Sequence, residues 1–203
     1  MFYKMMSIFG CSGCFKRLFL GQSYNNTPVN LSNISPAVQI DASKIGIDIV
    51  VVKQGQRVCG SGGALACAPI AQDKAYFETK VQSSGKWCVG LATCNYNPQG
   101  ELGQCGQSWA LKDNGTVTHN GEEKHKTSIS LDEGDVIGCT YDHVELVFYK
   151  NGSPLGIHVD GIKGTVYPAF YVDEGAILDT IFTGFYHAPP SGFHELMIEQ
   201  DIL

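Results

Sequence analysis

The sequence predicts an all-β fold built as a sandwich or a barrel. Short apolar runs alternate with turn residues along most of the chain, and its 24 glycines follow no collagen-like period. Many turns between many short strands are typical of these two architectures. Apolar residues make up 43% of the 203 positions and charged residues only 17%, so the chain can form one substantial core and is not expected to be disordered over most of its length.

The first 36 residues differ in composition from the rest of the chain. Residues 1–22 contain Met, Phe, Cys and a basic pair, and residues 23–36 are rich in Asn, Ser and Pro. We therefore expect a flexible N-terminal tail and linker over residues 1–36. A single domain with a C-terminal extension is expected to follow over residues 37–203.

Strand signals begin soon after this linker. Gly46–Val52 is apolar, and a polar turn returns the chain into Arg57–Cys59. The glycine-rich segment Gly60–Gly63 is expected to form a flexible corner before the apolar segment Ala64–Ala68. It lacks the lysine and the following helix of a phosphate-binding loop, so we interpret it as a strand corner.

The middle of the chain predicts strands on both sides of a long loop. Ala75–Gln82 alternates between apolar and polar residues, whereas Lys86–Thr93 is a more continuous apolar run, which is typical of a strand buried on both faces. Cys94–Gln107 has almost no apolar period, and loops longer than about 12 residues are often functional. Ser108–Leu111 and Gly115–His119 then form a predicted hairpin.

The segment Glu133–Gly156 predicts three short strands. Asp135–Thr140 forms the first, and Tyr141–His143 can turn the chain back. Asn151-Gly152 closes the second strand and is a strong hairpin signal, because both residues tolerate positive φ. The alternation in the second strand predicts that three of its residues build the core: Val144, Leu146 and Phe148.

The C-terminal part predicts one more pair of strands. Thr165–Val172 and Ala176–Phe182 are expected to pair around the turn Asp173–Gly175. Pro168 cannot donate a ladder hydrogen bond, so its strand is expected to lie at a sheet edge or to begin near this proline. Phe193–Ile202 is expected to form a short helix or a final strand.

Charge and cysteine content restrict the classes of function. The net charge is −6, with few and scattered Lys and Arg residues, which argues against a nucleic-acid partner. The apolar stretch Met5–Phe15 ends at Lys16 and Arg17, where a secretory signal would have a small-residue cleavage site. Eight cysteines in a chain without a convincing signal are expected to be reduced thiols in a cytoplasmic protein.

Two cysteines in the tail, Cys11 and Cys14, predict peripheral membrane association. They lie among apolar residues beside a basic pair, as S-acylated cysteines commonly do. Their spacing also suits metal ligands, but a structural zinc ion needs four ligands, and no second pair with suitable spacing is present in the sequence. We therefore expect no metal and no other cofactor.

Two other functions stay open as alternatives. One is a secreted or cell-surface lectin-like domain that binds carbohydrate. The second is an enzyme that uses Cys139 and His143, although no known catalytic motif surrounds them, so no catalytic residue is predicted. The lectin alternative rests on the sandwich type, which also suits sugar binding. Secretion would fit five asparagines that match the N-glycosylation pattern but also suit ordinary turns: Asn25, Asn30, Asn33, Asn114 and Asn151.

Binding through loops is the function that the residues themselves favour. Loops at one end of a sandwich can vary while the strands hold them in place. The long loop and the turn after Val172 are the best candidates. The candidate residues are Tyr96, Pro98 and Leu102 for apolar contacts and Glu101, Asp173 and Glu174 for charge.

Several segments, in the same order, resemble the SPRY domain family over about residues 37–185. Each piece alone is weak, but the combination is specific. The segments are Ala75–Val81, Trp87–Thr93, Ser108-Trp109, His119–Glu122, Gly134–Gly138, Val147–Gly152, Tyr167–Ala169 and Ile177–Asp179.

This resemblance implies a bent two-sheet antiparallel β-sandwich of the concanavalin-like jelly-roll type, without enzymatic activity. It also implies a monomeric domain that recognises a short segment of an unidentified partner protein or peptide through surface loops. Some relatives place apolar and aromatic residues where this chain has Asp173 and Glu174. Two carboxylates at this position favour a basic or polar ligand.

Overall fold

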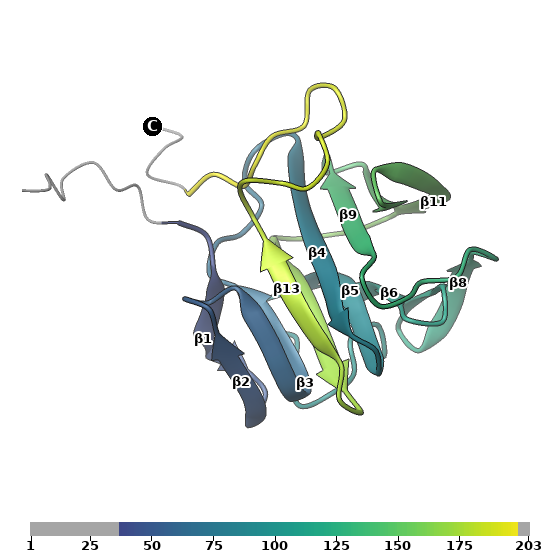
Figure 1. The fold of residues 1–203 in the computed structure, drawn as a ribbon. Helices are drawn as coiled ribbons and strands as arrows, with labels where there is room; N and C mark the ends of the chain where they lie inside the picture. The colour runs from purple at the N-terminus through teal and green to yellow at the C-terminus, as the bar shows by residue number, and fades with distance from the viewer. Residues whose placement is uncertain (1–36, 199–203) are drawn as a thin grey trace, which may run out of the picture. The chain divides into compact units, whose positions relative to one another are not determined.

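The computed structural model describes residues 37–198, and every regular element in this part of the chain is a β-strand (Figure 1). The tail cysteines Cys11 and Cys14 lie outside the described residues. The strands are β1 (Ile40–Ile45), β2 (Asp48–Val52), β3 (Arg57–Ala66), β4 (Ala75–Ser83), β5 (Lys86–Thr93), β6 (Ser108–Lys112), β7 (Thr116–His119), β8 (Glu122–Lys126), β9 (Val136–Tyr141), β10 (Glu145–Lys150), β11 (Ser153–Asp160), β12 (Val166–Asp173) and β13 (Ile177–Ile181).

The strands form two antiparallel sheets that share β3. One sheet has the order β1, β3, β12, β5, β6, β7, β8, and we call it sheet A. The other, sheet B, has the order β2, β3, β13, β4, β9, β10, β11. The predicted two-sheet antiparallel sandwich is therefore confirmed.

The predicted corner at Gly60–Gly63 is the place where β3 passes from one sheet to the other. Arg57–Ser61 pairs with β2 in sheet B, whereas Gly62–Leu65 pairs with β12 in sheet A. The strand is continuous through this point, and the change of sheet confirms the predicted strand corner. Gly60 has φ +103°, and a Cβ atom there would overlap the carbonyl oxygen of Asp48, which explains why glycine is needed.

The main core lies between the two sheets. Phe77 of β4 and Phe170 of β12 are fully buried and meet edge to face across the sandwich, with ring centroids 6.0 Å apart. A second, smaller cluster lies on the other face of sheet A, where Leu65 and Cys88 are buried. Both faces of β5 are therefore covered, which confirms the prediction for Lys86–Thr93.

The last two predicted strands are present, but they do not pair with each other. β12 lies between β3 and β5 in sheet A, and β13 lies between β3 and β4 in sheet B. The turn at Glu174 and Gly175, both with positive φ, carries the chain from one sheet to the other. β12 is therefore not an edge strand, but it begins at Val166, two residues before Pro168, as the second alternative expected. The ladder with β3 begins only at Ala169, so the missing N–H of Pro168 is not needed there.

The hairpin around Asn151-Gly152 is confirmed, with φ values of +49° and +79°. Leu146 and Phe148 are buried as predicted, but Val144 is 71% exposed. It lies in the turn before β10 begins, where the Asp142 carboxylate accepts hydrogen bonds from the backbone N–H groups of Val144 and Glu145. Val144 therefore belongs to the turn, and the prediction that it lies in the core is wrong.

The C-terminal segment crosses sheet B on the face turned away from the core. We call residues 183–194 the strap; it is the yellow segment that follows β13 in Figure 1. The ring of Phe185 meets Tyr76 of β4 edge to face at 4.8 Å. Residues 193–198 form neither the helix nor the strand that was expected, apart from one bridge between His194 and Ala75, because the Gln72 side chain bonds their backbone groups instead.

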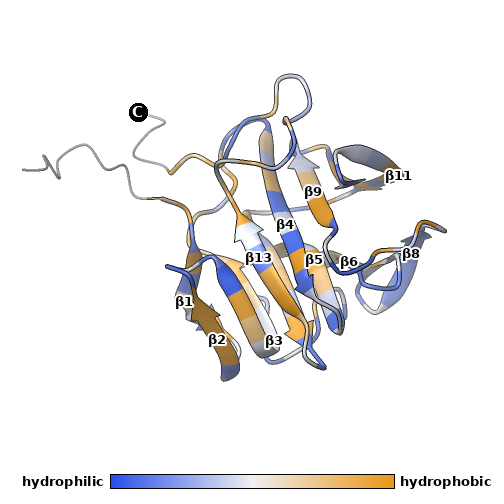
Figure 2. Ribbon diagram, viewed as in Figure 1, coloured by the Kyte–Doolittle hydropathy of each residue, from blue (hydrophilic) through white to orange (hydrophobic). Residues whose placement is uncertain are grey.

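Hydropathy differs strongly between two of the edge strands. Figure 2 shows β2 as hydrophobic and β8 as hydrophilic. Every residue of β8 is exposed. In β2, Val50 and Val52 are 54% and 43% exposed, whereas Ile49 is buried and Val51 is half-buried. The alternation in β2 reflects one face toward the core and one toward solvent.

Candidate functional site

Four connections meet at one end of the sandwich and surround an open hollow, which we call the rim hollow. They are the β4–β5 turn, the long loop after β5, the β6–β7 turn and the β12–β13 turn. The lining residues are Gly85, Lys86, Glu101, Lys112, Asp113, Asn114 and Glu174. Two residues that the sequence predicted for partner binding, Glu101 and Glu174, therefore lie in the same hollow.

The apolar residues of the long loop point inward instead of lining the surface. Tyr96 is 5% exposed and Leu102 is fully buried, and both pack in the smaller cluster on sheet A. The Tyr96 hydroxyl donates a hydrogen bond to the Gly100 carbonyl, which closes the loop on itself. The expectation that Tyr96 and Leu102 offer exposed apolar contacts is corrected, because these side chains anchor the loop to sheet A.

Pro98 fixes the same loop to the glycine corner of β3. Its carbonyl oxygen accepts a hydrogen bond of 2.7 Å from the Gly63 N–H, and a Cβ atom at Gly46 would lie 2.9 Å from that oxygen. The Pro98 ring is half-buried. This residue therefore contributes to the loop conformation, and its role in partner binding stays a prediction.

Glu101 forms the centre of a charged triad. Its two carboxylate oxygens accept hydrogen bonds from Lys86 at 2.6 Å and from Lys112 at 2.5 Å. Burial raises the pKa of Glu101, but the bonds from the two lysines outweigh it and leave the pKa below its usual value. The negative charge of Glu101 is thus neutralised within the site.

Two other carboxylates at the rim hollow have no cationic partner among residues 37–198. Asp113 is half-buried, and burial raises its pKa, against the weaker effect of nearby backbone N–H groups. Glu174 is exposed at the tip of the β12–β13 turn. A ligand that enters the hollow therefore meets two unpaired negative charges, on Asp113 and Glu174.

The remaining carboxylate of the turn, Asp173, holds the turn in shape. It accepts a hydrogen bond of 2.9 Å from the Glu174 N–H. This bond has the largest effect on the pKa of Asp173, and a bond from the Ser61 hydroxyl has the next largest. Both lower the pKa. Asp173 thus stabilises the backbone of the turn that carries Glu174, whereas its direct contact with a partner stays a prediction.

Sequence reasoning did not select Lys86 and Lys112 as site residues. Each lies at the end of a strand, where a lysine looks like an ordinary solvated residue. The β5–β6 ladder pairs Cys88 with Lys112, which places Lys112 near the start of β5 and close to Lys86. The long loop between these strands then brings Glu101 back to both. The proximity of Lys86, Lys112 and Glu101 therefore follows from the strand-pairing register, which the local sequence does not give.

The residues of the enzyme alternative do not form a reactive pair. Cys139 is fully buried in β9, and burial raises the pKa of its thiol well above the usual value. A reactive cysteine needs an accessible thiolate, so this residue is unsuited to that role. His143 lies in the exposed turn, where its Nε2 is 3.0 Å from the Gln72 carbonyl oxygen.

Other site types are absent from the described part of the chain. Residues 37–198 contain no cluster of three His, Cys, Asp or Glu placed to bind a metal ion. The same residues include no helix long and apolar enough to cross a membrane. Asn114 and Asn151 both stabilise turns: the first accepts a bond from the Thr116 N–H, and the second accepts one from the Val136 N–H.

Comparison with known proteins assigns the family. The model of the SPRY domain matches residues 74–185, more than half of the chain. The chain belongs to the SPRY domain family. SPRY domain-containing protein 7 from Homo sapiens and from Mus musculus is 49% identical over 170 residues, which cover 82% of this chain and 87% of that protein.

More distant proteins share the same fold or part of the sequence. The E3 ubiquitin-protein ligase RKP of Arabidopsis thaliana is 30% identical over 176 residues, which cover 79% of this chain and 14% of that protein. The crystal structure of the SPRY domain of human HERC1 has a TM-score of 0.61 and 20% identity. It covers 72% of this chain and 99% of that domain, and at this identity it supports the fold alone.

Proposed function

We propose that this SPRY domain is a non-enzymatic protein-interaction module that binds a short basic segment of a partner protein in the rim hollow. SPRY domains commonly serve in protein interactions, which supports the general class. The observation that carries the specific proposal is the pair of carboxylates on Asp113 and Glu174, which face the hollow without a cationic partner among the described residues.

The charge distribution favours a cationic ligand over an anionic one. The triad of Glu101 with two lysines carries one net positive charge, and Asp113 and Glu174 add two negative charges. The lining of the rim hollow therefore has a net charge of −1. Exposed ion pairs contribute only about 0.2–1 kcal/mol each, so charge here mainly determines which segments are accepted, and backbone and side-chain contacts must supply the rest.

A peptide-display experiment tests this proposal. Random ten-residue peptides should be enriched in Lys and Arg when they are selected on the wild-type protein. The variant with Asp113→Asn and Glu174→Gln should lose this enrichment, while Glu122→Gln with Glu123→Gln, an equal charge change on exposed β8, should retain it. Equal enrichment by the rim variant and the wild type would refute the proposed role of these carboxylates.

We further propose that the protein acts in the cytoplasm and that S-acylation of Cys11 and Cys14 tethers it to membranes. This proposal rests on the sequence alone. Two acyl chains, or one chain beside basic residues, give stable anchoring, whereas one chain does not. Protein isolated from its native cells should gain acyl mass that neutral hydroxylamine removes. An unmodified mass for residues 1–22 would contradict it.

A further inference from the structure

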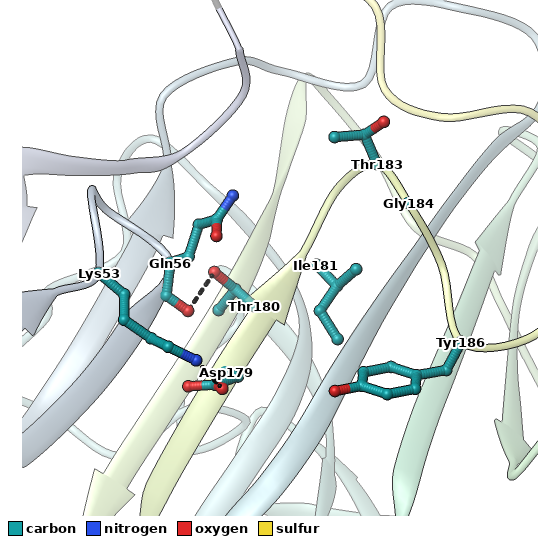
Figure 3. A pocket seen from close by; sticks show the side chains of 8 residues that line it. All are labelled: Lys53, Gln56, Asp179, Thr180, Ile181, Thr183, Gly184 and Tyr186. Carbon is teal, nitrogen blue, oxygen red and sulfur yellow. Dashed lines mark hydrogen bonds and ion pairs between the residues drawn. The ribbon is translucent and has the colours of Figure 1, made fainter.

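A second hollow lies on the outer face of sheet B, at the end of β13 opposite to the rim. Figure 3 shows it between Lys53 and Gln56 on one side and Tyr186 of the strap on the other, with Ile181 between them. Its volume is about 230 Å³, which suits a single amino-acid side chain rather than a large ligand. We call it the strap pocket.

Positive charge exceeds accessible negative charge around this pocket. Asp179 accepts two hydrogen bonds from Arg57, one of them at 2.8 Å, and a third at 2.8 Å from Lys53. The Asp179 carboxylate thus forms ion pairs with two cationic side chains. The side chain of Asp179 is only 11% exposed, whereas that of Lys53 is 54% exposed, so a ligand meets the ammonium group more readily than the carboxylate.

A third cation approaches the pocket from β4. The Nζ atom of Lys80 lies 4.9 Å from the centre of the Tyr186 ring, and Lys80 forms no ion pair within residues 37–198. The nearby carboxylate of Glu78 is fully buried and accepts hydrogen bonds from the strap, so it is closed to a ligand. Although the chain has a net charge of −6, this pocket has a surplus of cations.

Two exposed hydrogen-bond donors of the strap have no partner within the described residues. They are the backbone N–H of Gly184 and the hydroxyl of Tyr186. The Thr180 hydroxyl, in contrast, donates to the Gln56 carbonyl at 3.2 Å. Unused donors beside cationic side chains are the usual means of binding carboxylate and phosphate groups.

We infer that the strap pocket binds an oxyanion carried by a peptide side chain, either the carboxylate of an acidic residue or the phosphate of a phosphorylated one. The anion lies between Lys53 and Lys80 and accepts a hydrogen bond from the Tyr186 hydroxyl, which points toward Asp179 and Lys53 in Figure 3. A cationic ligand is disfavoured because Asp179 already holds two cations. This site is separate from the rim hollow and does not depend on the function proposed there.

Amide chemical shifts of the wild-type protein test this inference at constant ionic strength. The probes are three blocked peptides, Gly-Ala-X-Ala-Gly with X as Ser, Glu or phosphoserine, together with inorganic phosphate. Thr183, Gly184 and Tyr186 amides should shift with Glu, with phosphoserine or with both, and not with Ser. A shift with phosphoserine and inorganic phosphate alone identifies phosphate as the source of the oxyanion, and a shift with Glu identifies a carboxylate.

Three variants separate binding from general charge effects. Lys53→Met with Lys80→Met should weaken the binding of the shifting peptide at least five-fold, and Tyr186→Phe, which removes only a hydroxyl, at least two-fold. Lys163→Met, a substitution of an exposed lysine outside the pocket, should leave binding unchanged. The inference is overturned if no probe shifts the strap amides, or if Lys163→Met weakens binding as much as the double variant.

Discussion

Replacement of Glu78 by Gln should release the strap from sheet B while the rest of the sandwich stays folded. The Glu78 carboxylate is fully buried. It accepts hydrogen bonds from the Tyr76 hydroxyl at 2.8 Å and from the N–H groups of Tyr186 and His187 at 2.6 and 3.0 Å, and the Nδ1 atom of His187 lies 3.1 Å away. The part of the strap around Tyr186 and His187 is thus fixed by one acceptor group, whose two oxygens are both used, whereas its end is held by backbone hydrogen bonds of His194 with Lys74 and Tyr76.

The size of the effect follows from these contacts. An amide carries an NH2 group where the carboxylate has its second oxygen, so at least one backbone N–H of the strap must face another donor. Each hydrogen bond to a charged group contributes about 1.5–3 kcal/mol, and a buried unpaired donor adds a penalty. We expect Glu78→Gln to lower the free energy of unfolding by about 2–3 kcal/mol, and Glu78→Ala by about 3–5 kcal/mol.

Urea denaturation measures this loss, and hydrogen exchange locates it. The amides of Tyr186 and His187 should exchange faster in Glu78→Gln, while the amides of β5 should keep their protection. Glu145→Gln, a change of a carboxylate that is 40% exposed, serves as the matched control and should cost less than 1 kcal/mol. If Glu78→Gln costs less than 1 kcal/mol and protection is unchanged, the packing of Phe185 on Tyr76 holds the strap and the reasoning is wrong.

Three further predictions concern other parts of the fold. The pKa of Glu101 is lowered in the folded protein, so its stabilising effect is complete above its unfolded pKa of about 4.3 and is lost as the pH falls through its folded pKa. Glu101→Gln should therefore flatten the decline of the free energy of unfolding between about pH 5 and pH 3. Parallel curves of unfolding free energy against pH for the variant and the wild type would contradict this. Gly63→Ala should cost about 1–3 kcal/mol in urea denaturation, because the new methyl group overlaps the Tyr96 hydroxyl, and a neutral result would show that the loop moves freely. Asn151→Ala should lower the free energy of unfolding by about 2 kcal/mol, because the variant loses two side-chain hydrogen bonds and places alanine at a positive φ. Asn151→Gly should cost less, because glycine tolerates this φ and only the hydrogen bonds are lost. Equal losses of stability in the two variants would exclude the φ effect.

Elements with a strong local signal were predictable from the sequence. The continuous apolar run of β5 indicated burial on both faces, and Asn151-Gly152 indicated its hairpin. β8 was not predicted, because five exposed polar residues show no alternation; it forms by extending the ladder of β7. Strand pairing across the two sheets also lies beyond local patterns, which is why β12 and β13 were expected to pair with each other.

The candidate site residues also differ in how far the local sequence could predict their placement. The position of Glu174 in an accessible turn was predictable, whereas the pairing of Glu101 with two lysines, which leaves its side chain 17% exposed, was not. The burial of Tyr96 and Leu102 was not predictable either, since an apolar residue in a loop without a period can face either way. Glu78 looked like the solvent-facing residue of an alternating strand, and its strap partners are 108 and 109 positions away in the sequence.

The passage of β3 through both sheets has a consequence for how the domain opens. Its first half pairs with β2 and β13 in sheet B, and its second half pairs with β1 and β12 in sheet A. If β3 detached from one sheet, its neighbours in the other sheet would also lose their hydrogen-bonded partner. The two sheets are therefore expected to unfold as one cooperative unit. Within residues 37–198 we expect partial opening at the periphery, at β8, β11 and the strap, and a protease that cleaves this part of the native protein should cut there first.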